Sequence, residues 1–205
     1  GIPFSPDSTA SFNAAVDRRE NFQSPAEGDA IIIRKLPEVD FSGRDQQPWS
    51  RYPIWISFES AAGLLQRTQP LFQTRAFTPR IDLEPHFMTA FQWKGIHLIP
   101  SFAIRETGYG ERQQLTQNGQ NQIVGQDVNR FVRQFSMDLI LPPLAHTFQK
   151  KTFLGDKLKH VIEPRAVYRY VTGIGTDFNR FIRFDERDLL SNTNELMLSV
   201  TNRVY

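Results

Sequence analysis

Residues 158–171, LKHVIEPRAVYRYV, alternate between apolar and charged side chains with a period of two residues. A strand turns successive side chains to opposite faces, whereas a helix would scatter Glu163, Arg165 and Arg169 around its axis. The segment is therefore predicted to be a strand with two different faces. One face would carry His160, Ile162, Pro164, Ala166, Tyr168 and Tyr170, and the other Val161, Glu163, Arg165, Val167 and Arg169. The charged face could meet water outside a soluble sheet or water inside a large barrel.

The same alternation recurs along most of the chain. It predicts further strands at residues 11–22, 30–42, 49–65, 81–93, 96–105, 130–141 and 194–205. In residues 30–42, Ile33, Val39 and Phe41 share one parity, and Glu38 and Asp40 share the other. The prediction is about eight strands of roughly ten residues, the length that a tilted transmembrane strand needs.

The predicted connections alternate between short and long. Lys94-Gly95 is a tight hairpin signal, and residues 142–157 form a shorter, mixed connection. Residues 106–129 and 173–192 form long polar loops. An even number of strands separates these two loops, so both are expected on the same side of the sheet. Outer-membrane barrels show this asymmetry, with short periplasmic turns and long outer loops.

Composition excludes several classes of protein. The net charge of +2 is spread along the chain, so there is no basic stripe for nucleic acid. The absence of cysteine excludes a disulfide framework and a thiolate metal site within these residues. No apolar run is long enough for a transmembrane helix. A mean hydropathy of -0.42 still permits a transmembrane barrel, because only alternate strand residues face lipid there. The chain begins at Gly1 rather than Met, so we expect a section of a longer protein.

No catalytic motif is visible in the sequence, so neither an enzyme nor a cofactor is predicted. His86 and His97 lie on neighbouring predicted strands, on the same face as Glu84 if the register allows. As metal ligands they form an incomplete set, so no metal site is predicted, and the three residues are interpreted as a polar, water-facing lining.

A charged stretch at the end of the second long loop offers two interpretations. Asp185, Glu186 and Asp188 lie close to Arg180, Arg183 and Arg187. The first interpretation is a salt-bridged surface loop. The second is an outer loop that meets lipid phosphates through cations or arginines.

Four segments resemble the barrel of the lipopolysaccharide-assembly family LptD, also called the organic-solvent-tolerance or OstA family. They are LPEVDFS at 36–42, LKHVIEPRAVYRYV at 158–171, FIRFDERD at 181–188 and SNTNELMLSVTNRVY at 191–205. The resemblance implies a very large barrel in the bacterial outer membrane, preceded by a periplasmic jelly-roll. It also implies that lipopolysaccharide is received from an LptA-like periplasmic bridge and placed in the outer leaflet, with an LptE-like lipoprotein plugging the lumen.

The resulting hypothesis is an all-β, antiparallel, up-and-down transmembrane β-barrel, of which residues 1–205 form an interior section without the jelly-roll and the terminal strands. The expected lumen-facing residues are Glu163, Arg165, Arg169, Glu84, His86 and His97. The expected lipid-facing residues are Ile162, Ala166, Tyr168 and Tyr170. The expected partners are lipopolysaccharide and outer-membrane lipid. The alternatives are a passive outer-membrane pore or receptor barrel and a soluble lipid-binding β-barrel.

Overall fold

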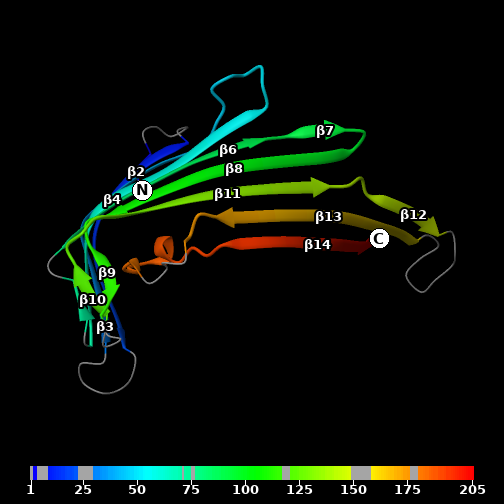
Figure 1. Ribbon diagram of the computed structural model, residues 1–205. Helices are drawn as coiled ribbons and strands as arrows, with labels where there is room; N and C mark the ends of the chain where they lie inside the picture. The colour runs from blue at the N-terminus through cyan, green and yellow to red at the C-terminus, as the bar shows by residue number, and fades with distance from the viewer. Residues whose placement is uncertain are drawn as a thin grey trace.

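The computed structural model describes residues 2–3, 9–22, 30–70, 72–74, 77–116, 121–148, 158–175 and 180–205. These residues form one long, curved antiparallel sheet (Figure 1). Its eight long strands are β2 (Ala10–Phe22), β3 (Ala30–Gln46), β4 (Ile54–Gln69), β6 (Thr78–Thr89), β8 (Ile96–Tyr109), β11 (Val128–Ile140), β13 (Leu158–Thr172) and β14 (Thr193–Val204). Each pairs with the next in chain order, so the predicted all-β, up-and-down antiparallel fold is confirmed.

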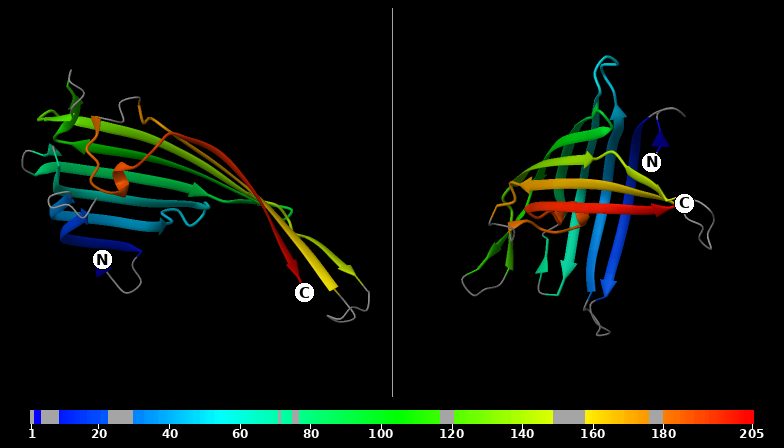
Figure 2. Two further views of the ribbon diagram at one scale, coloured as in Figure 1. Left: turned by 90° about the horizontal axis from the view of Figure 1, so that it is seen from below. Right: turned by 90° about the vertical axis from the view of Figure 1, so that its right-hand side faces the viewer.

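Short strands extend this sheet or stand beside it. The sheet is extended by β1 (Ile2–Pro3), β5 (Phe72–Gln73), β7 (Phe91–Trp93) and β12 (Leu144–Phe148), and a separate hairpin is formed by β9 (Arg112–Leu115) and β10 (Asn121–Val124). Among the described residues, β14 pairs only with β13, and β1 and β2 form the other edge, so the sheet is open (Figure 2). Within the same residues, no helix is both long enough and apolar enough to cross a membrane.

The tight hairpin and the relative sides of the two long loops agree with the prediction. Lys94 and Gly95 both have positive φ, 47° and 83°, which matches the tight hairpin turn expected there. Both β8 and β13 run antiparallel to β11, so the connections after Tyr109 and after Thr172 leave the same end of the sheet. The described parts of the two long loops therefore begin on the same side, as expected.

Several predicted boundaries are wrong. The strand expected to start at Trp49 begins at Ile54, after a turn, and it continues to Gln69. The loop expected at 106–129 is shorter, because β8 continues to Tyr109 and β11 begins at Val128. Between them, β9 and β10 form their own hairpin.

A β-bulge in β3 overturns one predicted face. Lys35 stands opposite Leu65 and Glu38 opposite Gly63, so three residues of β3 span two residues of β4. The extra residue switches the parity, and Ile33 therefore shares a face with Glu38 rather than with Val39 and Phe41. Gly63 makes the bulge feasible, because a Cβ atom there would lie 3.1 Å from the carbonyl oxygen of Pro37.

One face of the sheet is apolar and exposed. Phe87, Phe102, Phe135 and Tyr170 form one row across four strands, from β6 to β13. Large side chains on this face are strongly exposed, with Leu198 at 72% and Ile81 at 66%. A contiguous apolar surface of this kind indicates contact with a membrane or a partner rather than with water.

The opposite face is polar, and the small cores lie on it. Leu65, Tyr109, Ile182 and Phe184 form one buried cluster, and Val132, Val171 and Ile174 form another. Both clusters combine strand residues with residues from the 173–192 connection. That connection therefore folds back onto the polar face instead of extending beyond the end of the sheet (Figure 2).

Candidate functional site: a loop segment docked on the charged face

The final part of the connection between β13 and β14, residues 180–192, is here called the docked segment. It contains a single helical turn, η2 (Glu186–Asp188), which is closed by a capping box between Asp185 and Asp188. The side chain of Asp185 accepts a hydrogen bond from the backbone N–H of Arg187. The backbone N–H of Phe184 donates in turn to Asp188 at 2.8 Å. These local bonds satisfy the ends of the turn and direct both carboxylates towards the sheet.

Arg80 is the centre of the contact between the docked segment and the sheet. It lies on β6 and is 2% exposed. Its two terminal nitrogens each donate to one oxygen of Asp185 at 2.8 Å, in the bidentate geometry that arginine forms with carboxylates. Arg80 also donates to Asp188 at 3.1 Å and to Glu38 at 2.7 Å.

Lys35 provides the second cation at this position. Its Nζ donates to Glu38 and to Asp185, both at 2.7 Å. The side chain lies on β3, two strands away from Arg80, with β4 between them. A single carboxylate therefore links two strands that are not neighbours.

The backbone of the docked segment is held as well as its side chains. Arg130 on β11 donates to the carbonyl oxygens of Arg187 at 2.6 Å and Asp188 at 3.1 Å. The hydroxyl of Tyr109 on β8 donates a hydrogen bond to the carboxylate of Asp188, and Arg67 on β4 donates one to the carbonyl oxygen of Arg183. One helical turn thus contacts strands from β3 to β11. Since four strand spacings would span about 19 Å on a flat sheet, the polar face must curve around the segment.

A second set of polar contacts lies beside the first on the same face of the sheet. Arg105 on β8 makes two hydrogen bonds to Asp82 on β6, at 3.0 and 2.8 Å. Thr107 donates to the same carboxylate, and Arg105 lies 3.3 Å from Glu84. These groups are nearly all buried, and Thr107 links them to the first set by accepting a hydrogen bond from Arg130 at 3.3 Å.

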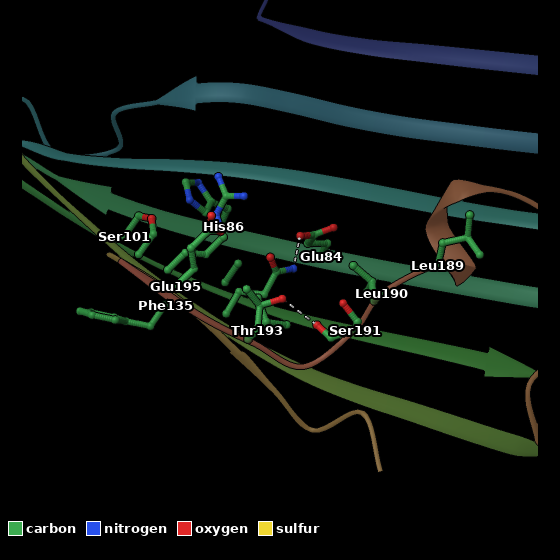
Figure 3. A pocket seen from close by; sticks show the side chains of 14 residues that line it. Glu84, His86, Ser101, Phe135, Leu189, Leu190, Ser191, Thr193 and Glu195 are labelled. Carbon is green, nitrogen blue, oxygen red and sulfur yellow. Dashed lines mark hydrogen bonds between the residues drawn. The ribbon is translucent and has the colours of Figure 1, made fainter. Parts of the chain in front are cut away.

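A cavity of about 470 Å³ adjoins the docked segment (Figure 3). Leu189, Leu190 and Ser191 line it from the segment, and Glu84 and His86 line it from β6. Arg169 on β13 and Glu195 on β14, which stand opposite each other, also line it. The cavity is therefore a polar space bounded by the sheet and by the end of the segment.

The structure gathers only part of the predicted polar set. Glu84, His86 and Arg169 meet at this cavity. His97 stands opposite Gln92, six residues along the sheet from His86, a separation of about 20 Å at the strand rise. Within the described part of the chain, no three His, Asp or Glu side chains are placed to hold a metal ion.

The remaining predicted residues lie along β13. Arg165 makes an ion pair with Asp138, and Glu163 lies 3.1 Å from Arg203, both on the polar face. On the other face, Ala166 stands opposite Leu139 and Leu198, and Tyr168 opposite Met137 and Leu196. Ile162 and Tyr170 share that apolar face by register.

The prediction of a surface loop at 185–188 is wrong for its two aspartates. Asp188 is 1% exposed, and the side chain of Asp185 is 7% exposed. Their cationic partners are Lys35 and Arg80 on the sheet, rather than the arginines of the loop itself. Burial with the sheet cations satisfies both carboxylates, so they do not need solvent.

The same contacts set the acid sensitivity of the docked segment. Burial alone would raise the pKa of Asp185, but the hydrogen bonds and charges of Arg80 and then Lys35 hold this pKa well below its ordinary value of 3.8. The contribution of Asp185 to docking is therefore present above pH 3.8 and is lost as the pH falls from 3.8 towards the docked pKa. In that range the free energy of docking falls by up to about 1.4 kcal/mol per pH unit, because Asp185 takes up one proton when the segment is released.

Pepsin, which cleaves at aromatic residues in acid, measures this effect at Phe181 and Phe184. We expect both bonds to be protected at pH 5 and to be cleaved increasingly below pH 3.8. A free peptide of residues 180–192 corrects for the pH dependence of pepsin itself. Release with a midpoint at or above pH 5 would assign the transition to a group other than Asp185.

Comparison with known proteins identifies a family. A family model described as LptD, LPS transport system D, matches residues 8–205. A search of curated proteins found no match.

Proposed function

This chain belongs to the LptD family, and on that basis we propose that residues 1–205 form part of the wall of an outer-membrane β-barrel that inserts lipopolysaccharide into the outer leaflet. The role of the family is lipopolysaccharide transport and assembly at the outer membrane, and it is a transport component. The observation that carries the finer proposal is the two-faced sheet, which has an exposed apolar surface on one side and a buried charged network on the other.

In this proposal the apolar face contacts lipid and the polar face lines the lumen. Ile162, Ala166, Tyr168 and Tyr170 would face lipid, and Glu163, Arg165, Arg169, Glu84, His86 and His97 would face the lumen. Support comes from the register, which keeps Leu139, Ala166 and Leu198 in one row across three strands. It also comes from strand lengths of 12 residues or more in all eight long strands, sufficient for a tilted crossing.

Two partners follow from the family resemblance alone. They are an LptE-like lipoprotein in the lumen and an LptA-like bridge that supplies lipopolysaccharide from the periplasm. The docked segment supports a filled lumen, because it already occupies the concave side of this section of the wall.

The soluble lipid-binding barrel is disfavoured by the direction in which the sheet curves. Such a barrel would place its apolar side chains inside, around the lipid. Here the sheet curves around Asp185 and Asp188, and the large apolar side chains are exposed on the other face.

Depletion of the parent protein tests the proposed function. We expect the protein to fractionate with the outer membrane, and newly made lipopolysaccharide to remain short of the cell surface when the protein is depleted. Surface lipopolysaccharide is measured by antibody or polymyxin binding on intact cells. A parent in the soluble fraction, with normal surface lipopolysaccharide after depletion, would disprove the translocon hypothesis.

A further inference from the structure

Three cations are held under the docked segment with few other partners. Lys35, Arg80 and Arg130 lie on β3, β6 and β11, and they are between 2% and 9% exposed. They are here called the cation cradle. Of the seven carboxylate and carbonyl oxygens that they bind among the described residues, five belong to the docked segment and two, both of Glu38, belong to the sheet.

Removing the segment would leave the cradle short of anions. Arg80 would lose three hydrogen bonds and, within the described part of the chain, would keep the one to Glu38, the carboxylate that it shares with Lys35. Arg130 would lose both carbonyl oxygens and, among the described residues, would keep Thr107 at 3.3 Å as its hydrogen-bond acceptor. Arg105 would remain neutralised by Asp82, so it is not one of the cations that lose a partner. Lys35 and Arg80 would then share a single carboxylate, and Arg130 would keep no carboxylate or carbonyl acceptor among the described residues.

Arg130 also has an unused donor. Although its side chain is 3% exposed, its Nε–H has no hydrogen-bond acceptor among the described residues. A buried donor without an acceptor is costly, and such a group is commonly satisfied by a ligand or by water. The cradle therefore has donor capacity that the docked segment does not use.

From these contacts we propose that the cation cradle is a binding site for a phosphate group, which the carboxylates of Asp185 and Asp188 occupy until the docked segment is displaced. The bidentate contact of Arg80 with Asp185 has the geometry that arginine also forms with phosphate. This inference deepens the proposed function, since it names a chemical group of the transported lipid and a segment that competes with it.

The cavity beside the segment provides an approach to the cradle. Leu189, the residue after Asp188, lines it, and Glu84 on its wall contacts Arg105, which lies beside the cradle on the same face. A phosphorylated headgroup that enters the cavity would therefore meet the segment at Leu189–Ser191, directly after Asp188 in the chain (Figure 3).

Direct binding to the purified full-length protein in detergent tests the proposal. Asp185→Asn with Asp188→Asn keeps the size of both side chains and removes both charges, and we expect it to bind labelled inorganic phosphate at least tenfold more tightly. Adding Arg80→Gln should abolish the gain. Two controls should behave like their parent proteins: Glu186→Gln removes an exposed charge from the same turn, and Arg34→Gln removes an exposed arginine beside Lys35.

A competition experiment, in which unlabelled compounds displace the labelled phosphate, identifies the source of the phosphate group. A phosphorylated glucosamine lipid that displaces labelled phosphate, while its dephosphorylated form does not, supports a lipid headgroup as the ligand. Displacement by free phosphate alone supports a small anion in the same cradle. The proposal is overturned if the assembled double variant gains no affinity, or if the gain survives Arg80→Gln.

A second measurement needs no variant. Because the phosphate and the docked segment compete, phosphate should release the segment from the unmodified protein by the same linkage. We expect phosphate to accelerate tryptic cleavage after Arg183 and Arg187, relative to chloride at equal ionic strength. Equal cleavage in both salts would overturn the proposal. Neither readout depends on lipopolysaccharide delivery, so a failure of the proposed function is detected separately in the depletion experiment.

Discussion

Arg80→Gln is expected to release the docked segment from the sheet. The substitution removes the cation that contacts Glu38, Asp185 and Asp188. It leaves Glu38 and Asp185 with Lys35 as their main remaining partner, and Asp188 with the hydroxyl of Tyr109 and two backbone N–H groups. Removing one partner of a buried ion pair costs about 3–5 kcal/mol, because the remaining charge is buried without compensation. Docking should therefore weaken by roughly a hundredfold or more.

Trypsin measures the release directly, since Arg180, Arg183 and Arg187 provide cleavage sites within the docked segment. The cleavage rate follows the undocked population when docking is fast relative to cleavage. Arg34→Gln is the matched control, because Arg34 is exposed and its side chain donates to Gln66 on β4 at 3.2 Å rather than to the docked segment. An unchanged rate in Arg80→Gln would show that the segment is held without Arg80, by the packing of Ile182 and Phe184 and by its other polar contacts.

The strands were predictable because each one separates two different environments. In β13 the polar alternates are Glu163, Arg165 and Arg169, and the register places them opposite polar or small residues on β11 and β14 along most of the strand. The hairpin at Lys94-Gly95 was predictable for a local reason, since glycine accepts the positive φ that the turn requires.

The bulge in β3 could not be deduced from parity, because parity assumes an uninterrupted ladder. Pro37 was the available signal, since a proline inside a strand is usually confined to an edge or a bulge. A shift of one residue exchanges the two faces, and for this reason Ile33 was assigned to the wrong side.

The cation cradle depends on register, which alternation does not determine. Lys35, Arg80 and Arg130 lie on separate strands, and each resembles an ordinary polar alternate in the sequence. The docked segment did carry a signal, because Ile182 and Phe184 are large apolar residues that an exposed loop would not retain. Asp185 and Asp188 are three residues apart on one turn. Together with Ile182 and Phe184, they are more typical of a segment packed against the sheet than of a solvated loop.

The assignment of faces in β13 leads to the second large effect. We expect Ala166→Arg to lower the amount of assembled barrel, because the new charge would lie between Leu139 and Leu198 on the face proposed to contact lipid. Such a charge costs about 2–4 kcal/mol near the bilayer midplane and less near the interface. Val167→Arg is the matched control, since Val167 stands opposite Asp138 on the polar face and the new cation would gain a carboxylate neighbour.

Assembly of the two variants is compared by the heat-modifiable mobility of the full-length protein, and a labelling experiment separates membrane contact from simple burial. A soluble barrel would also penalise Ala166→Arg, but it would not expose residue 166 to the bilayer. A cysteine at 166 should therefore react with a thiol reagent confined to the bilayer, whereas a cysteine at 167 should not. If Val167→Arg is the more damaging substitution, or if the labelling is reversed, β13 presents its charged residues to lipid. The assigned faces of β11 and β14 would then also be reversed, because the register pairs each residue of β13 with a residue on the same face of these two strands.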